Sequence, residues 1–227
     1  MILKKIEKTL LRPISRALKG KPDKFLKNVT GIIHVGANTG QERELYRYYG
    51  VNVIWIEPIP SVFDQLNDNI KDFENQYAIQ SLITDVDDQE YEFHIASNNG
   101  GSSSILEFAQ HKDVWPHVYY TTTMHIKSLT LATLFEKERI DASQYQALIM
   151  DTQGSELLVL RGAIPVLSHV RYIKTEAWDF ESYKGCCQVS DINDFMVGHG
   201  FKEISRKKHA GKEKGGFYFD IVYRRET

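Results

Sequence analysis

Residues 31–40, Gly-Ile-Ile-His-Val-Gly-Ala-Asn-Thr-Gly, join a short apolar and β-branched run to a turn that contains two glycines. The run predicts a buried strand, and Gln41 to Tyr49 predict the helix that follows it. Glycine lets a backbone approach a ligand closely, and the free N–H groups at a helix N-terminus attract polar or anionic groups. The stretch therefore predicts a strand, a ligand-binding turn and a helix.

Predicted strands and helices continue to alternate along the chain. Strands are predicted at 51–56, 77–83, 91–96, 147–150, 171–176, 201–206 and 217–223, and helices at 61–73, with Ser61 as cap, 156–167 and 191–199. This alternation predicts an α/β fold, a mostly parallel sheet with helices on both faces. The last two strands have no helix between them and predict an antiparallel hairpin at the sheet edge. Residues 97–120 are predicted to form a long loop, of a length that often carries function.

The composition excludes several classes of protein. The chain has 227 residues and two adjacent cysteines, Cys186 and Cys187, so a secreted disulfide framework and a paired Cys-x-x-Cys zinc site are excluded. No apolar run approaches the roughly 18 residues that a membrane-spanning helix needs. The first residues also lack the continuous apolar stretch of an export signal, so a cytoplasmic location is expected.

Charge is unevenly distributed. Residues 1–24 contain eight basic and two acidic side chains, a net charge of +6, which leaves −8 for the remaining 203 residues of a chain whose net charge is −2. An acidic body argues against a nucleic-acid partner. Apolar residues recur every three or four positions in this segment and predict a basic amphipathic leader helix, residues 1–29, ahead of one domain at 30–227. The helix either packs on the body or is frayed in solvent, or it lies on anionic lipid at the inner membrane surface or on a partner protein.

The turns after the strands are where a parallel sheet binds ligands. Gly36 and Gly40 are spaced as G-x-x-x-G, which differs from the G-x-G-x-x-G turn that holds a pyrophosphate. Glu57 follows the second strand, where a carboxylate can accept hydrogen bonds from ribose hydroxyls, and Asp85 ends the third, near an adenine amine. The alternative for both acids is a solvated carboxylate in a turn. Together the turns predict an adenosine site without pyrophosphate.

Three motifs resemble the FkbM family of S-adenosylmethionine-dependent methyltransferases. They are His34-Val-Gly-Ala-Asn-Thr-Gly40, Trp55-Ile-Glu-Pro58 and Leu148-Ile-Met-Asp-Thr-Gln-Gly-Ser-Glu-Leu-Leu-Val-Leu-Arg-Gly-Ala163, and the resemblance covers residues 30–225. It implies a class I (Rossmann-like) methyltransferase fold with a mostly parallel seven-stranded sheet. It also implies S-adenosylmethionine as cofactor and methyl transfer, commonly to a hydroxyl of a sugar, glycan or related natural product.

The resemblance also implies which residues bind the cofactor. The expected contacts are Gly36, Asn38 and Gly40 at the methionine and ribose end, Glu57 at the ribose, Asp85 at the adenine, Asp151 and Gln153 in the signature turn that Glu156 closes, and Ser102 in the small-residue stretch Gly101-Ser-Ser-Ser104.

Catalysis of O-methylation needs little beyond alignment, because the sulfonium donor is already activated, but a hydroxyl acceptor must lose a proton. Asp151 and Glu176 end the fourth and fifth predicted strands and face the same crevice. One of the two is expected to orient or deprotonate the acceptor. Asp151 could instead bond backbone N–H groups of its own turn. His34 is expected to be a buried, hydrogen-bonded core histidine, and no histidine pair has metal-ligand spacing, so no metal is expected.

Two alternatives remain open from the sequence. One is a methyltransferase that acts on RNA or protein, against which stand the acidic body and the absence of an Asn-Pro-Pro-Tyr-like turn. The other is a non-catalytic S-adenosylmethionine-binding scaffold attached to a membrane or partner by its leader, against which stand the intact Gly36, Gly40, Glu57 and Asp151. The sequence leaves the acceptor and the oligomeric state open.

Overall fold

The computed structural model describes residues 23–212 and 215–226, so almost all of the predicted leader helix lies outside the described residues. The main sheet contains β1 (Gly31–Val35), β2 (Asn52–Ile56), β3 (Gln76–Ile79), β7 (Ala147–Met150), β8 (Tyr172–Trp178), β9 (Phe201–Gly211) and β10 (Phe217–Arg225); a smaller sheet contains β4 (Leu82–Ile83), β5 (Glu90–Ala96) and β6 (Tyr120–Leu129). The α-helices are α2 (Arg43–Tyr49), α3 (Pro60–Ile70), α4 (Leu131–Glu138), α5 (Glu156–Gly162) and α6 (Val189–Gly198). Short 3₁₀ helices are η1 (Asp23–Asn28), η2 (Gln110–Asp113), η3 (Ala142–Gln144) and η4 (Ile164–His169).

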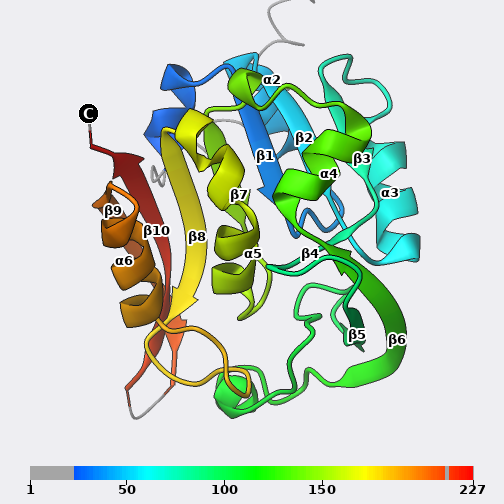
Figure 1. Ribbon diagram of the computed structural model, residues 1–227. Coiled ribbons are helices and arrows are strands. Elements are labelled where there is room, and N and C mark those ends of the chain that lie inside the picture. The colour runs from blue at the N-terminus through cyan, green and yellow to red at the C-terminus, as the bar shows by residue number, and fades with distance from the viewer. Residues whose placement is uncertain (1–22, 213–214, 227) are drawn as a thin grey trace, which may run out of the picture.

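The main sheet has seven strands in the order β3-β2-β1-β7-β8-β10-β9 (Figure 1). Neighbouring strands from β3 to β8 are parallel, whereas β10 runs antiparallel to both β8 and β9. The predicted fold class, with its antiparallel hairpin at the edge, is confirmed. Strand order reverses between β1 and β7, which is where sheets of this kind bind ligands.

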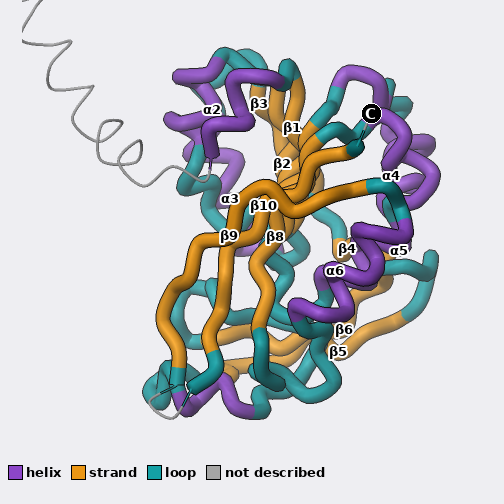
Figure 2. Tube along the Cα trace, turned by 90° about the vertical axis from the view of Figure 1, so that its left-hand side faces the viewer, coloured by secondary structure: helices purple, strands orange, loops and turns teal. Residues whose placement is uncertain are grey.

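Helices cover both faces of the sheet, with α2 and α3 on one side and α4, α5 and α6 on the other (Figure 2). The central strands β1 and β7 are buried at every position, which explains why they are continuous apolar runs rather than alternating ones. The core also includes Phe25 and Leu26 of η1, so the body begins before residue 30. No helix in the described part of the chain is long and apolar enough to cross a membrane.

The structure differs from the prediction around the third strand. The predicted strand at 77–83 is divided in two: β3 ends at Ile79, and Leu82 and Ile83 pair with β6 in the smaller sheet. Strand β6 and helix α4 were not predicted. The side chains of β6 are polar and largely exposed, so that strand carries little apolar signal. The helix α3 starts at Pro60 after Ile59, not at Ser61, since proline is favoured in a first helical turn.

Residues 97–119 are held in place by contacts with distant parts of the chain. The segment contains η2 and isolated bridges from Ser104 to His94 and from Phe108 to Tyr183. Phe108 also stacks on His111, and both rings contact Tyr183. The predicted long loop is therefore packed against the connection between β8 and α6 and forms one wall above the sheet.

Candidate active site

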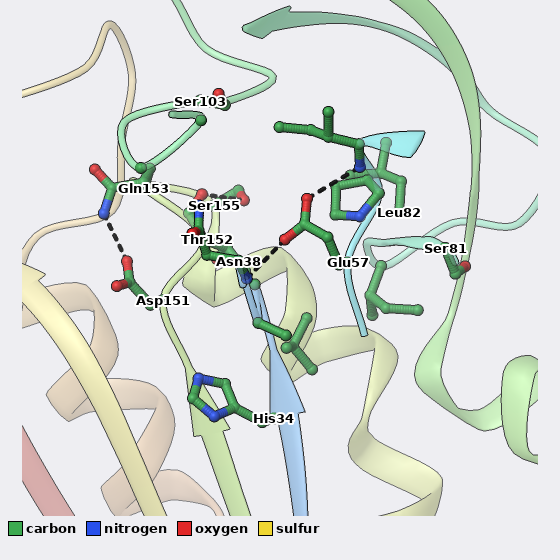
Figure 3. A pocket seen from close by; sticks show the side chains of 18 of the residues that line it. His34, Asn38, Glu57, Ser81, Leu82, Ser103, Asp151, Thr152, Gln153 and Ser155 are labelled. Atoms are coloured by element: carbon green, nitrogen blue, oxygen red, sulfur yellow. Dashed lines mark hydrogen bonds between the residues drawn. The ribbon is translucent and has the colours of Figure 1, made fainter. Parts of the chain in front are cut away.

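A cavity of about 270 Å³ lies at the carboxyl ends of β1, β2 and β7, where the strand order reverses (Figure 3). The turn after β1, the end of β2, the start of β4, the segment 100–103 and the signature turn after β7 all contribute to its wall. The predicted site residues that line it are Gly36, Asn38, Glu57, Asp151 and Gln153. Gly40, Asp85, Ser102 and Glu176 are not among its lining residues.

The glycine turn brings two strand ends into backbone contact. Gly36 has a φ of +76°, and a Cβ built on it would lie 2.0 Å from the carbonyl oxygen of Asp151. Its N–H donates to the carbonyl oxygen of Ile56 over 3.0 Å. Gly40 is not among the lining residues, and a Cβ built on it would lie 2.7 Å from Leu66 Cδ1 of α3, so this glycine allows the turn to lie close to that helix.

Glu57 is buried, 4% exposed, and both of its carboxylate oxygens accept backbone hydrogen bonds. Oε2 accepts from the N–H of Asn38 over 2.8 Å, and Oε1 accepts from the N–H of Ile59 over 3.0 Å. Burial raises the pKa of Glu57 to about 7, although these two donors act in the opposite direction. Each oxygen keeps a further acceptor site, which matches a pair of vicinal hydroxyls.

Asn38 connects the glycine turn to the segment above the cavity. Its φ is +45°, and its Nδ2 donates to the carbonyl oxygen of Asn99 over 3.1 Å. Asn38 therefore positions Glu57 through its backbone and the 97–103 segment through its side chain.

Asp85 is not among the residues that line the cavity, and its contact with the adenine stays a prediction. Because the chain leaves the main sheet after Ile79, Asp85 lies beyond β4 and forms a 4.0 Å ion pair with Arg161 of α5. Ser81 and Leu82 line the cavity instead. Together with Ile59 and Phe93 they provide a mostly apolar wall of the kind that suits a planar base.

Ser102 also lies outside the cavity lining. Its backbone N–H donates to Asn98 Oδ1, and its Oγ accepts from Asn98 Nδ2 over 3.0 Å and lies 3.2 Å from His111 Nε2. The neighbouring Gly101 and Ser103 line the cavity. The small-residue stretch thus lies at the expected place, while the particular serine points into the protein.

The signature turn is organised by Glu156 at the start of α5. This carboxylate is 1% exposed and accepts from the N–H of Thr152 over 2.9 Å and from the N–H of Gly154 over 3.0 Å. A negative charge at a helix N-terminus is favourable. At the other end of α5, a Cβ on Gly162 would lie 2.0 Å from the carbonyl oxygen of Thr84, so that glycine allows the helix to lie close to β4.

Asp151 and Glu176 lie close together and share one donor. Gln153 Nε2 donates to Asp151 Oδ1 over 2.6 Å and to Glu176 Oε2 over 3.0 Å. Burial and the charge of Asp151 raise the pKa of Glu176 well above its usual range. The surrounding protein also raises the pKa of Asp151, against the effect of the bond from Gln153.

His34 forms part of the cavity floor from within β1. It is buried, its Nδ1 lies 3.0 Å from the hydroxyl of Tyr46, and its ring stacks on Trp55. Burial lowers its pKa to about 4, so the imidazole is neutral at pH 7. The prediction of a buried, hydrogen-bonded histidine is confirmed. In the part of the chain that the structure describes, no three His, Cys, Asp or Glu side chains are grouped to hold a metal ion.

Comparison with known proteins identifies the family. Residues 34–203 match the family model described as the methyltransferase FkbM domain. No curated protein sequence matches the chain.

Among solved structures, Sp1610 from Streptococcus pneumoniae, a putative tRNA (m1A22) methyltransferase, is similar with a TM-score of 0.50 and 10% identity over 92% of this chain and 71% of that one. The same protein in complex with S-adenosyl-L-methionine gives a TM-score of 0.51 and 12% identity over 90% and 72%. The METTL16 methyltransferase domain gives 0.51 and 8% identity over 89% and 64%.

These structures have low identity to the chain and therefore support the fold alone, which is that of class I methyltransferases. The expected S-adenosylmethionine dependence agrees with both the family match and this fold. Since the family model covers well over half of the sequence and includes all three motifs, the assignment does not depend on one turn. The chain belongs to the FkbM methyltransferase family.

Proposed function

We propose that this S-adenosylmethionine-dependent methyltransferase transfers a methyl group to a hydroxyl oxygen of a sugar, a glycan or a related natural product. The observation that supports the proposal is the pairing of two carboxylates on one cavity. Glu57 is buried with acceptor capacity to spare, and Asp151 is exposed and lines the same cavity. Glu57 can accept hydrogen bonds from a ribose, and Asp151 can accept one from the hydroxyl of the methyl acceptor.

The residues present fit the cofactor. Glu57 would hold the ribose hydroxyls, and Ile59, Leu82 and Phe93 would flank the adenine. Thr152 lies on the wall beside the glycine turn, and its buried Oγ1 has no hydrogen-bond partner among the described residues. Buried polar atoms rarely stay unpaired, so this hydroxyl fits a polar group of a ligand. When bound, S-adenosylmethionine supplies an activated methyl group.

The two carboxylates have different chemical roles in this proposal. Asp151 lines the cavity, and its carboxylate can accept the proton of an acceptor hydroxyl. Glu176 lies outside the cavity lining, and burial and the charge of Asp151 raise its pKa well above the usual range. Asp151 is therefore the proposed general base, and Glu176 supports it.

The charge of the site favours an uncharged hydroxyl acceptor over a nucleic acid. Glu42, Glu57 and Asp151 all line the cavity, and the chain beyond residue 24 carries a net charge of −8. Phosphate-rich acceptors would be repelled by this lining. A cytoplasmic location and a membrane or partner contact of residues 1–24 stay predictions from the sequence.

Calorimetric titration of the protein with S-adenosylhomocysteine tests the cofactor site, with NAD as the control. We expect micromolar binding of S-adenosylhomocysteine and none of NAD, because the turn lacks the pyrophosphate pattern. Transfer of tritiated methyl groups to a panel of uncharged hexosides and oligosaccharides then tests the acceptor. Binding of neither nucleoside, or transfer only to RNA or protein, would contradict the proposal.

The affinity for S-adenosylhomocysteine is expected to fall as the pH drops below 7. Ribose hydroxyls donate to the ionised form of Glu57, whose pKa is about 7, so protonation competes with binding. The expected loss is up to about tenfold per pH unit between pH 7 and 5. Titrations at several pH values check this. Glu57→Gln should bind weakly at every pH without this slope, whereas the surface variant Glu44→Gln should behave like wild type. A flat wild-type profile would exclude an ionised Glu57 from ribose binding.

A further inference from the structure

The side-chain amide of Gln153 forms three hydrogen bonds to side chains. Its two N–H groups donate to Asp151 Oδ1 and Glu176 Oε2, over 2.6 Å and 3.0 Å. Its Oε1 accepts from the hydroxyl of Tyr183. Gln153 is 9% exposed and Tyr183 is fully buried, so water competes little for these bonds. The amide joins three elements: the turn after β7, the strand β8 and the segment before α6.

In the observed orientation the amide nitrogen faces the two acids and the amide oxygen faces the tyrosine hydroxyl, so the side chain bonds to three partners at once. The Tyr183 hydroxyl donates to Oε1 and supports this orientation. Tyr183 has no contact with the cavity itself, because it is absent from the lining residues.

The backbone at Gln153 indicates that its side chain is needed at this position. Its φ is +53°, a left-handed conformation that is unfavourable for residues other than glycine and asparagine. Its carbonyl oxygen accepts from Ser104 Oγ over 2.9 Å, which ties the turn to the segment above the cavity. A glycine at position 153 would adopt this φ without strain, yet the residue there is a glutamine.

We propose that Gln153 is a positioning residue that holds the Asp151 carboxylate toward the cavity and the Glu176 carboxyl group behind it, with Tyr183 fixing the amide. This inference rests on the proposed function, because it assigns Asp151 as the base that meets the acceptor. It changes the expectation that Gln153 contacts the cofactor. It also gives different roles to Asp151 and Glu176, either of which could be the base on the sequence alone.

Titration of the two carboxyl groups in the full-length protein tests the inference without any acceptor. The carboxyl carbons of Asp151 and Glu176 are followed by ¹³C NMR in wild type, in Gln153→Met, which keeps the length but loses the bonds, and in Tyr183→Phe. We expect the Asp151 midpoint to rise by about one pH unit in Gln153→Met, the effect of one lost bond to a carboxylate, and by less in Tyr183→Phe. The matched surface controls Gln65→Met and Tyr48→Phe should leave both midpoints unchanged.

Kinetics provide the second readout. In both variants kcat for methyl transfer should fall while the KM for S-adenosylmethionine stays constant, and the acid limb of kcat should move to higher pH because the base ionises later. Unchanged carboxyl midpoints in Gln153→Met would overturn the inference and leave Gln153 a packing residue. If Gln153→Met does not fold, unchanged carboxyl midpoints in Tyr183→Phe would overturn the inference instead. If wild type transfers no methyl group, the proposed function fails, but the titration still decides the role of Gln153.

Discussion

Replacing Asp151 with asparagine is expected to lower the rate of methyl transfer by about 10²–10⁴-fold, the range of general-base catalysis, while S-adenosylhomocysteine binding changes little. Asparagine keeps the size of the side chain and an oxygen that accepts from Gln153 Nε2. It cannot take the proton of an acceptor hydroxyl. A lower rate with unchanged S-adenosylhomocysteine binding would therefore show that Asp151 acts in catalysis and not in cofactor binding.

The measurement is kcat for tritiated methyl transfer to the acceptor found in the sugar panel, beside calorimetric binding of S-adenosylhomocysteine. Asp68→Asn, on the exposed face of α3, serves as the control, since its side chain is 82% exposed. The double variant Asp151→Asn/Glu176→Gln should be little worse than Asp151→Asn alone, because the two acids act as one unit. Turnover near the wild-type rate in the double variant would refute the assignment of the base.

Replacing Gly36 with alanine is expected to destabilise the fold by about 3 kcal/mol or more and to abolish S-adenosylhomocysteine binding. The added Cβ would lie 2.0 Å from the carbonyl oxygen of Asp151, which belongs to the backbone and cannot rotate away. Relief of this clash would separate β1 from β7 at the very end where the cavity opens. The left-handed φ adds a further penalty for a non-glycine residue.

Urea unfolding of Gly36→Ala and Gly50→Ala measures the effect with a matched control. Gly50 has a similar φ of +66° at the end of α2, but a Cβ on it would meet nothing within 4 Å. Alanine at Gly50 should therefore cost only about 1–2 kcal/mol, the price of the left-handed conformation. Equal losses in the two variants would mean that conformation alone, and not contact with Asp151, requires glycine at position 36.

The sequence predicted the central elements well because their signals are local. Strand β1 and its turn, the acid at the end of β2 and the strand before Asp151 are each encoded by neighbouring residues. The fold class, the family and the position of Glu57 on the cavity followed from these short patterns. Asp85 and Ser102 lie outside the cavity lining because the chain leaves the main sheet or turns a side chain inward there, which a local pattern does not record.

Local sequence patterns thus account for the strands and helices of the main sheet, the glycine turn and the chemical types of the acids around the site. The tertiary structure decided which acid meets the cavity. Glu176 is 23 residues beyond Gln153, and Tyr183 is 30 residues beyond it, yet both bond to its one amide. Strand register and the packing of the 97–119 segment bring these groups together. No periodicity along the chain encodes a contact between residues so far apart in the sequence. The difference between Asp151 and Glu176 depends on burial and on one shared donor, which exist only in the folded chain.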